Sequence, residues 1–316
     1  MAGTLDPPPP PMLYPPMAIT GRTRLAGLVG WPIAQSRSPA LHNHWLARYG
    51  INGAYVPLPV PPGGLPAALS GLAAAGFAGV NVTYPHKEDA AALCQYLSPM
   101  AQRCGAVNTI VFGPDGAVGD ITDGTGFVAA LRGTGAVPAP AIIGHAIVSS
   151  EIMGPAMILG AGGAAAAIAA ALLDVGIAVT IAARTAHRAD ALAARLPGLM
   201  TCPWADRLAL GPIRLLINAT PLGMVGQPPL DMPLDTAPPG LMVAEIVLAP
   251  RITPLLAAAT ARGLATADGL GMLVNQAVPG FAAWFGTIPA ADDAAFAAAD
   301  GVAADVMAAD VMAAGG

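Results

Sequence analysis

A lysine at the end of a long uncharged segment is the first residue suited to chemistry. The segment Ile51–His86 contains no Asp, Glu, Lys or Arg, and Lys87 follows it directly. Pro85 removes a backbone donor and favours an extended Tyr84, so residues 80–84 are predicted to be a strand that ends in a turn. Lys87 then lies past the C-terminal end of a strand, where open α/β sheets place their ligands. A partly desolvated lysine there is a candidate proton-transfer group, although the motif alone fits a solvated loop lysine better.

One amide and two acidic side chains further along are candidate partners for this lysine. Asn108 lies within a predicted strand, Cys104–Phe112, and needs a hydrogen-bond partner if it is buried. Asp120 and Asp123 follow a predicted hairpin turn at residues 114–116. A single aspartate next to a turn glycine is usually a turn former, so these residues gain meaning only in combination.

Two serines precede a predicted helix near the N-terminus. Ser38-Pro39 is a typical helix start, with Ser38 as the N-cap and the helix running to about Tyr49. Hydroxyls and free amides at a helix N-terminus suit a carboxylate ligand. Simple capping explains Ser38 alone and leaves Ser36 for another purpose.

A glycine-rich turn in the second half indicates a dinucleotide site. An apolar strand ends at Gly160, an alanine-rich helix follows, and residues 178–182 form the next strand of a βαβ unit. In this setting Gly160 makes the tight turn, Gly162 admits a pyrophosphate, and the small Ala165 lets the helix approach the sheet.

The end of the second strand of this unit selects the cofactor. An NAD site expects a carboxylate there for the ribose hydroxyls, whereas this chain has Arg184, Thr185 and Arg188 and no acidic residue. Guanidinium groups pair well with phosphate oxygens, so the pattern favours NADP with its 2′-phosphate.

The elements that must position these residues alternate between strand and helix, which predicts an α/β fold with parallel sheets. Predicted strands are Arg24–Val29, Val56–Val60, Gly79–Thr83, Arg214–Ala219 and Leu241–Leu248; predicted helices are Leu65–Ala75, Lys87–Leu97, one beginning at Phe127, and one from Asp268 to about Phe285. The glycine- and proline-marked segment 133–155 is the natural linker between two domains.

Composition excludes several function classes. Fourteen basic and nineteen acidic residues give a net charge of −5 without a basic run, which argues against nucleic acid as a partner. The uncharged stretch Ile152–Leu173 is the nearest membrane candidate, but its glycines fit the cofactor pattern, so no membrane segment is expected. Residues 1–20 are proline-rich, carry no Lys or Arg, and are expected to be a disordered tail rather than a signal peptide.

Cysteine and histidine usage predicts no metal site. Cys94, Cys104 and Cys202 are odd in number and form no close ligand pair, which indicates reduced thiols in a cytoplasmic protein. His42 and His44 lie two apart, with no third ligand suggested nearby.

Taken in order, five motifs resemble the shikimate dehydrogenase family of the aromatic amino-acid pathway, over roughly Leu25–Pro289. They are Gln35-Ser36-Arg37-Ser38-Pro39; Asn81-Val82-Thr83 to Lys87; Gly105-Ala106-Val107-Asn108-Thr109; Thr122-Asp123-Gly124; and Asp268-Gly269-Leu270-Gly271-Met272-Leu273 with Gln276. The resemblance implies an N-terminal α/β substrate domain and an NADP-binding Rossmann domain separated by a cleft. The implied boundaries are residues 21–130 for the first domain, with 268–290 packing back on it, 131–267 for the second, and 291–316 for an Ala/Asp-rich tail.

The resemblance also implies a part for each site residue. Ser36 and Ser38 would hold the substrate carboxylate, and Thr83, Asn108 and Gln276 would hydrogen-bond its hydroxyls. Lys87 and Asp123 would meet at the carbon being oxidised, where either is a possible formal base. The implied cofactor-binding residues are Gly160, Ala161, Gly162, Gly163, Ala164, Arg184, Thr185, Arg188, Thr220, Gly269 and Met272.

Several positions depart from the family pattern. Ile121 stands where an Asn usually precedes the Thr-Asp pair, and Ala183 replaces an Asn beside Arg184. Glu245 and Leu248 stand where the family usually has Asp and a substrate-facing Tyr. The segment 133–155 is also longer than the family norm.

The implied function is NADP-dependent interconversion of 3-dehydroshikimate and shikimate by a monomer or homodimer. Two alternatives stay open: a paralogue acting on quinate, an aminated analogue or a related cyclohexene carboxylate, and a ligand-binding relative without turnover. Retention of both Lys87 and Asp123 argues against the second alternative.

Overall fold

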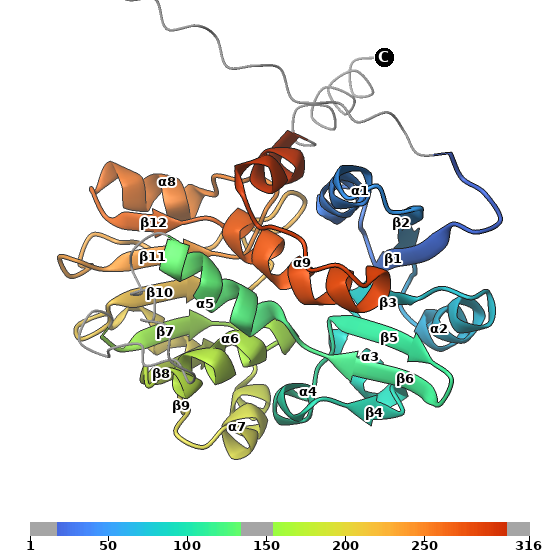
Figure 1. The fold of residues 1–316 in the computed structure, drawn as a ribbon. Helices are drawn as coiled ribbons and strands as arrows, with labels where there is room; N and C mark the ends of the chain where they lie inside the picture. The colour runs from blue at the N-terminus through green and yellow to red at the C-terminus, as the bar shows by residue number, and fades with distance from the viewer. Residues whose placement is uncertain (1–17, 134–153, 302–316) are drawn as a thin grey trace, which may run out of the picture.

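The computed structural model describes residues 18–133 and 154–301, and contains two six-stranded sheets in separate halves of the molecule (Figure 1). Most of the expected tail at 1–20, most of the linker 133–155, and the end of the tail 291–316 lie outside the described residues. Within the described ranges, no helix is long and apolar enough to cross a membrane.

The first sheet has the order β2-β1-β3-β5-β6-β4. Its strands are β1 (Arg24–Gly30), β2 (Gly53–Pro59), β3 (Gly79–Val82), β4 (Tyr96–Leu97), β5 (Thr109–Gly113) and β6 (Gly116–Asp120). The predicted parallel arrangement holds for β1, β2 and β3, but β5 runs antiparallel to β3 and to β6. The tight turn between β5 and β6, which the sequence predicts at residues 114–116, explains why this pair is antiparallel, because such a turn joins antiparallel strands.

The helices of this half are α1 (Ser38–Arg48), α2 (Leu65–Ala74), α3 (Lys87–Leu93) and α4 (Pro99–Cys104). Two sequence predictions were wrong here. The helix from Lys87 ends at Leu93 because the chain turns extended at Cys94 and then pairs as β4 with β6. Ser38 does not cap α1: it is already helical, and no side chain makes a capping hydrogen bond there.

The second sheet is entirely parallel, in the order β12-β11-β10-β7-β8-β9. Its strands are β7 (Ala156–Leu159), β8 (Val179–Ala183), β9 (Met200–Pro203), β10 (Leu215–Asn218), β11 (Met242–Glu245) and β12 (Ala265–Ala267). The helical elements are α6 (Gly163–Asp174), α7 (Ala186–Arg195), the 3-10 helix η1 (Trp204–Leu208) and α8 (Pro254–Ala261). Strand order reverses between β7 and β10, which is the place where doubly wound sheets bind their ligands.

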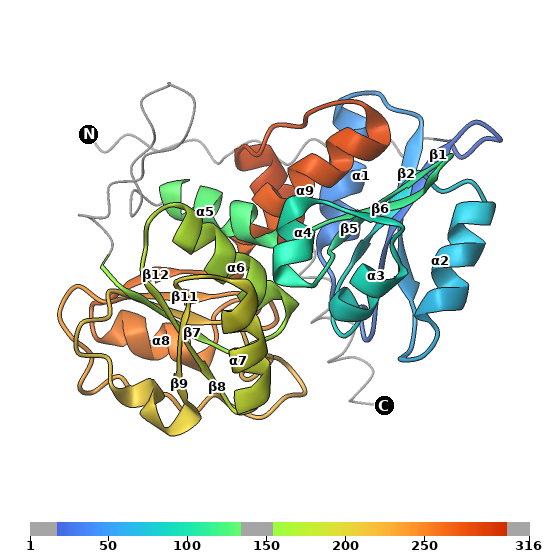
Figure 2. The ribbon, with the colours of Figure 1, turned by 90° about the horizontal axis from the view of Figure 1, so that it is seen from below.

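Two helices lie between the sheets and join the halves: α5 (Asp123–Gly133) and α9 (Gly269–Phe285) (Figures 1 and 2). Their backbones approach closely, since a Cβ on Gly126 would lie 2.6 Å from the backbone nitrogen of Gln276. α9 is anchored on the first sheet by Trp284, whose Nε1 donates to the carbonyl of Ile110 at 2.9 Å.

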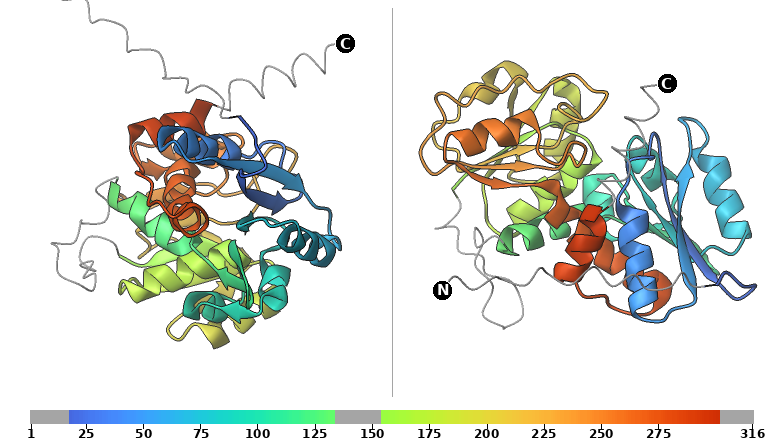
Figure 3. Two further views of the ribbon diagram at one scale, coloured as in Figure 1. Left: turned by 45° about the vertical axis from the view of Figure 1, so that its right-hand side comes forward. Right: turned by 90° about the horizontal axis from the view of Figure 1, so that it is seen from above.

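A helical segment at residues 293–301 packs against the first half, where the sequence predicts part of a tail. Ala295 and Ala299 are fully buried in a cluster with residues of α1 and α9, including Trp45 and Phe281. Figure 3 shows this segment beside α1 at the upper edge of the left-hand view. Small alanine side chains on one face explain how this alanine- and aspartate-rich sequence docks as a helix.

Candidate active site

A cavity of about 710 Å³ is lined by residues of both halves. Every residue to which the resemblance gives a part lies on its wall: Ser36, Ser38, Thr83, Lys87, Asn108, Asp123, Gly160, Ala161, Gly162, Gly163, Ala164, Arg184, Thr185, Arg188, Thr220, Gly269, Met272 and Gln276. Asp120 does not line the cavity: its carboxylate accepts from Ser98 and from the backbone nitrogen of Ile121. The cavity divides into a region beside the first sheet, with hydroxyl, amide and charged groups, and a region beside the glycine turn.

A shielded ion pair lies at the junction of these two regions. Lys87 Nζ is 2.5 Å from Asp123 Oδ2, and the two side chains are 17% and 6% exposed. Lys87 opens α3 directly after the turn that follows β3, and Asp123 opens α5 after β6. Two sequence-distant groups of opposite charge thus meet at strand ends, as a proton-transfer site requires.

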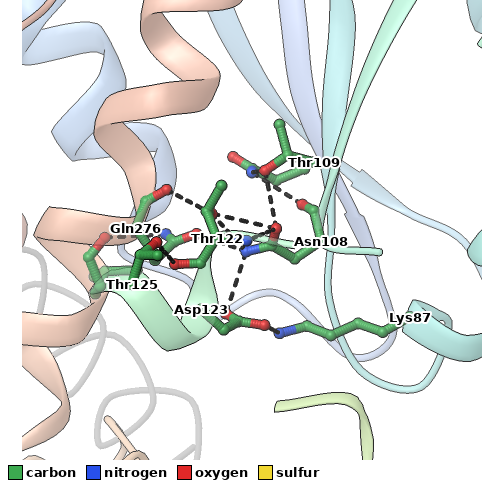
Figure 4. A network of polar contacts seen from close by, with 9 residues as sticks. Lys87, Asn108, Thr109, Thr122, Asp123, Thr125 and Gln276 are labelled. Carbon is green, nitrogen blue, oxygen red and sulfur yellow. Dashed lines mark hydrogen bonds and ion pairs between the residues drawn. The ribbon is translucent and has the colours of Figure 1, made fainter. Parts of the chain in front are cut away.

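Asn108 organises the polar groups around this pair (Figure 4). Its Nδ2 donates to Asp123 Oδ1 at 3.2 Å, to Gln276 Oε1 at 3.0 Å and to Thr122 Oγ1 at 3.0 Å. Its Oδ1 accepts from the backbone nitrogen of Thr122 at 2.9 Å, and Thr122 Oγ1 donates to the carbonyl of Gln276 at 2.8 Å. The network fixes the orientation of Asp123 relative to α9. Sequence reasoning missed Thr122 as an orienting residue, although it belongs to one of the motifs.

A second buried network supports Asn108 from the sheet side. Tyr55 donates its hydroxyl to Asn81 Oδ1 at 2.7 Å, and Asn81 Nδ2 donates to the Asn108 carbonyl at 3.0 Å and to Thr109 Oγ1 at 3.1 Å. Burial raises the pKa of Tyr55 well above its usual value, so this hydroxyl stays a neutral donor. Asn81 is therefore a structural support beneath the site.

Two serine hydroxyls lie at the start of α1 and in the loop before it, at another wall of the cavity. Ser36 Oγ accepts from the backbone nitrogen of Ser38 at 3.3 Å, which shapes the loop before α1. Ser38 is 6% exposed and lines the cavity together with Ser36 and Thr83. Ser38 does not cap the helix, whereas Ser36 accepts from the first amide of α1.

Two departures from the family pattern lie in different surroundings, one in the core and one at the cavity. Ile121 is buried among apolar residues, and Asp123 takes its amide donor from Asn108 instead. Leu248 presents a side chain to the cavity wall where the family usually has a tyrosine.

The third departure, Glu245, is a buried carboxyl at the end of β11. It accepts from Asn218 Nδ2 at 3.0 Å, from Thr253 Oγ1 at 3.1 Å and from the backbone nitrogen of Val247 at 3.0 Å. Asn218 in turn accepts from the Thr220 hydroxyl at 2.7 Å, so Glu245 supports a residue on the cavity wall. Burial raises the pKa of the Glu245 carboxyl from 4.5 to about 7, against these hydrogen bonds.

The glycine turn has the geometry that a dinucleotide needs. Gly160 has φ +109°, and a Cβ there would lie 3.1 Å from the Ala219 carbonyl. Gly162 precedes α6, and a Cβ on it would meet nothing within 4 Å, so open space lies over the helix N-terminus. A Cβ on Gly163 would lie 3.2 Å from Lys87 Cβ, which shows how closely the helix start approaches the ion pair.

Basic residues follow β8 at the outer end of the cavity. Arg184 and Thr185 are exposed, and Arg188 forms an ion pair with Glu88 of α3 across the cavity. The free amides at the start of α6, the open space over Gly162 and the adjacent guanidinium groups fit a phosphorylated dinucleotide.

A doubly wound sheet with a glycine turn at its switch point, facing a shielded lysine–aspartate pair, defines a two-domain nicotinamide-dependent oxidoreductase. The family model described as "Shikimate dehydrogenase substrate binding domain" matches residues 28–110. The NADP⁺ shikimate dehydrogenase of Acidiphilium cryptum is 53% identical over 283 residues, covering 89% of this chain and 98% of that protein. The chain therefore belongs to the shikimate dehydrogenase family.

Solved structures agree with this assignment. Shikimate 5-dehydrogenase from Thermus thermophilus, in complex with NADP(H) and shikimate, superposes with a TM-score of 0.77 at 35% identity, covering 89% of this chain and 100% of that one. Quinate dehydrogenase from Corynebacterium glutamicum, in complex with NAD, gives a TM-score of 0.74 at 28% identity, covering 86% and 97%.

Proposed function

We propose that this protein is an NADP-dependent shikimate dehydrogenase, which interconverts 3-dehydroshikimate and shikimate. The observation that carries the proposal is the Lys87–Asp123 pair, joined at 2.5 Å beside the glycine turn. Relatives about half identical to this chain have that activity in their names, and a similar structure was solved with both ligands. The reaction belongs to aromatic amino-acid biosynthesis, which supports a cytoplasmic location.

The first half supplies the substrate contacts in this proposal. Ser36 and Ser38 receive the carboxylate through their hydroxyls and the amides at the start of α1. Thr83, Asn108 and Gln276 hydrogen-bond the ring hydroxyls, and the network around Asn108 holds two of these groups in fixed orientations.

The ion pair handles the proton of the alcohol. NADP, when bound, accepts the hydride from the carbon that carries the reacting hydroxyl. As the C–H bond breaks and the C–O bond becomes double, the hydroxyl proton passes to the Lys87–Asp123 pair. Lys87 is the more exposed partner and releases the proton to solvent, while Asp123 is held by Asn108 and orients both the lysine and the hydroxyl. In the reducing direction the same pair returns a proton to the oxygen.

The second half supplies the groups that bind the cofactor and that distinguish NADP from NAD in this proposal. The helix N-terminus after Gly162 receives the pyrophosphate, and Arg184, Thr185 and Arg188 receive the 2′-phosphate that distinguishes NADP from NAD. Thr220, Gly269 and Met272 border the region between this end and the ion pair.

Leu248 favours a second candidate function. It removes a hydroxyl from the wall that receives the substrate carboxylate, and a changed wall suits a related acid such as quinate. A ligand-binding relative without turnover is disfavoured, because a binder has no need for the shielded proton-transfer pair.

Initial rates with shikimate and quinate, each with NADP and with NAD, test the proposal. We expect turnover with shikimate and NADP to exceed the other three combinations. Faster turnover of quinate would move the assignment to the second candidate, and no turnover of either acid would overturn the assignment to an active dehydrogenase.

A further inference from the structure

The residue between the two proposed carboxylate-binding serines is a buried cation held by the C-terminal segment. Arg37 is 5% exposed. Its Nη1 donates to Asp300 Oδ1 at 2.8 Å and to the carbonyls of Ala299 at 3.3 Å and Asp300 at 3.2 Å, and its Nη2 donates to the Leu248 carbonyl at 3.4 Å. The only carboxylate that pairs with Arg37 within the described ranges is thus Asp300, from a segment 263 positions away.

Asp300 also belongs to a chain of alternating charges. Its Oδ2 pairs with Arg251 Nη1, and Arg251 Nε donates to Asp268 Oδ2 at 2.6 Å. Asp268 Oδ1 accepts from the backbone nitrogen of Leu270 at 3.0 Å and so caps α9. Asp300 is the carboxylate that joins Arg37 to this chain of charges, beside the direct bond from Arg37 to the Leu248 carbonyl. The Arg251–Asp268 pair and the α9 cap are formed by other groups.

Without the Asp300 carboxylate, Arg37 keeps its three carbonyl acceptors but has no opposite charge beside a buried guanidinium. An unpaired buried charge is costly, which favours a shift of the guanidinium towards solvent. Arg37 is covalently between Ser36 and Ser38, so its movement displaces both serines. Substrate binding depends more strongly on the two serines because the Leu248 side chain offers no hydroxyl to the carboxylate. The Leu248 carbonyl itself accepts from Arg37.

We propose that Asp300 is a positioning residue for substrate binding: through Arg37 it holds the Ser36–Ser38 loop in the shape that receives the carboxylate. This inference rests on the proposed function. It assigns a part in substrate recognition to a C-terminal segment whose sequence, rich in alanine, carries no motif.

Asp300→Ala in the full chain tests the inference, with shikimate and NADP varied separately. Loss of one charge-assisted contact to a buried group predicts a roughly tenfold rise in KM for shikimate. We expect kcat to change less than about twofold and KM for NADP to stay the same, because the cap of α9 is retained. A purely structural role would instead lower kcat and raise both KM values together.

Asp292→Asn is the matched control, because it removes a negative charge but keeps the side-chain oxygen that accepts from the backbone nitrogen of Ala295 at 3.2 Å. Asp292 lies near the start of the same segment and pairs with Arg48 of α1 at 2.8 Å, away from the substrate loop. We expect this variant to keep the wild-type KM for shikimate. If Asp300→Ala does not fold, Asp300→Asn, which keeps an acceptor for Arg37, replaces it and is expected to give a smaller rise in the same constant.

The outcomes separate the two proposals. A wild-type protein without shikimate turnover refutes the proposed function. An active wild type whose KM for shikimate is unchanged in the Asp300 variants, or matched by the Asp292 variant, overturns the positioning role of Asp300.

Discussion

Replacing Lys87 by Ala removes the proton-transfer partner while leaving most of the cavity wall intact. Lys87 Nζ lies 2.5 Å from Asp123 Oδ2, and the lysine side chain is 17% exposed. A water molecule that replaced the ammonium group would not be held in the same geometry. A positioned acid or base contributes roughly 10²- to 10⁴-fold to a rate, and we expect kcat for shikimate oxidation to fall about a thousandfold, or about 4 kcal/mol.

The same substitution also affects stability, and the two effects must be measured separately. Asp123, which is 6% exposed beside Lys87, would keep Asn108 at 3.2 Å as a side-chain partner but lose its cation. Loss of one member of a buried ion pair costs several kcal/mol, and the partial exposure of Lys87 places the expected cost at the low end, about 3 kcal/mol. Thermal melts and NADP affinity therefore accompany the kinetics, and catalytic loss is read only in protein that is folded and binds NADP.

A double-mutant comparison sharpens the test. If Lys87 and Asp123 act as one unit, Lys87→Ala combined with Asp123→Asn lowers kcat no further than the worse single variant. The reasoning is refuted if Lys87→Ala keeps more than about a tenth of the wild-type kcat, or if the two losses multiply.

Three further predictions concern the cofactor end, the helix contact and the buried carboxyl. Arg184→Ala removes one guanidinium from the proposed 2′-phosphate site, so KM for NADP rises roughly tenfold or more while KM for NAD is unchanged, as initial rates will show. Gly126→Ala places a Cβ 2.6 Å from the backbone of Gln276 and lowers the free energy of unfolding by about 1–3 kcal/mol, whereas Gly71→Ala, with open space around it, does not destabilise the protein in the same urea titration. Burial raises the pKa of Glu245 from 4.5 to about 7 in the folded protein. The stability that the protonated carboxyl contributes is therefore fully present below its pKa in the unfolded chain, and it is lost as pH rises through its pKa in the folded protein. Relative to Glu245→Gln, the wild-type free energy of unfolding therefore falls by about 2–3 kcal/mol from about pH 5 to about pH 8, and a constant difference across this range would contradict the burial argument.

Local signals predicted much of the fold and site. The βαβ unit follows from an apolar strand, three glycines and an alanine-rich helix, all within a few turns of chain. Lys87 is placed by the turn before it, and its position at a strand end needs no knowledge of the rest of the fold. These features depend on backbone geometry, which residue type controls directly.

The parts that sequence did not predict depend on contacts between distant segments. The bond between Asn108 and Gln276 joins residues 168 positions apart, and that between Arg37 and Asp300 joins residues 263 positions apart. The short helix α4 was missed although Ser98 and Pro99 are a typical cap and first-turn pair, and Ser98 does cap it. The Ser-Pro pair at Ser38 gave the opposite error, a predicted cap that the structure lacks. Ser38 does not cap α1, because the helix begins at Ser38, one residue earlier than the pair predicts.

The most direct measurement is the fate of the hydrogen on the carbon being oxidised. Shikimate carrying deuterium at that carbon is incubated with the protein and NADP, and the reduced nicotinamide is analysed by mass spectrometry. Hydride transfer within the cavity predicts that the label appears in NADPH, with one deuterium transferred for each 3-dehydroshikimate formed. Product formation without label in NADPH, or no product at all, would contradict the proposed reaction.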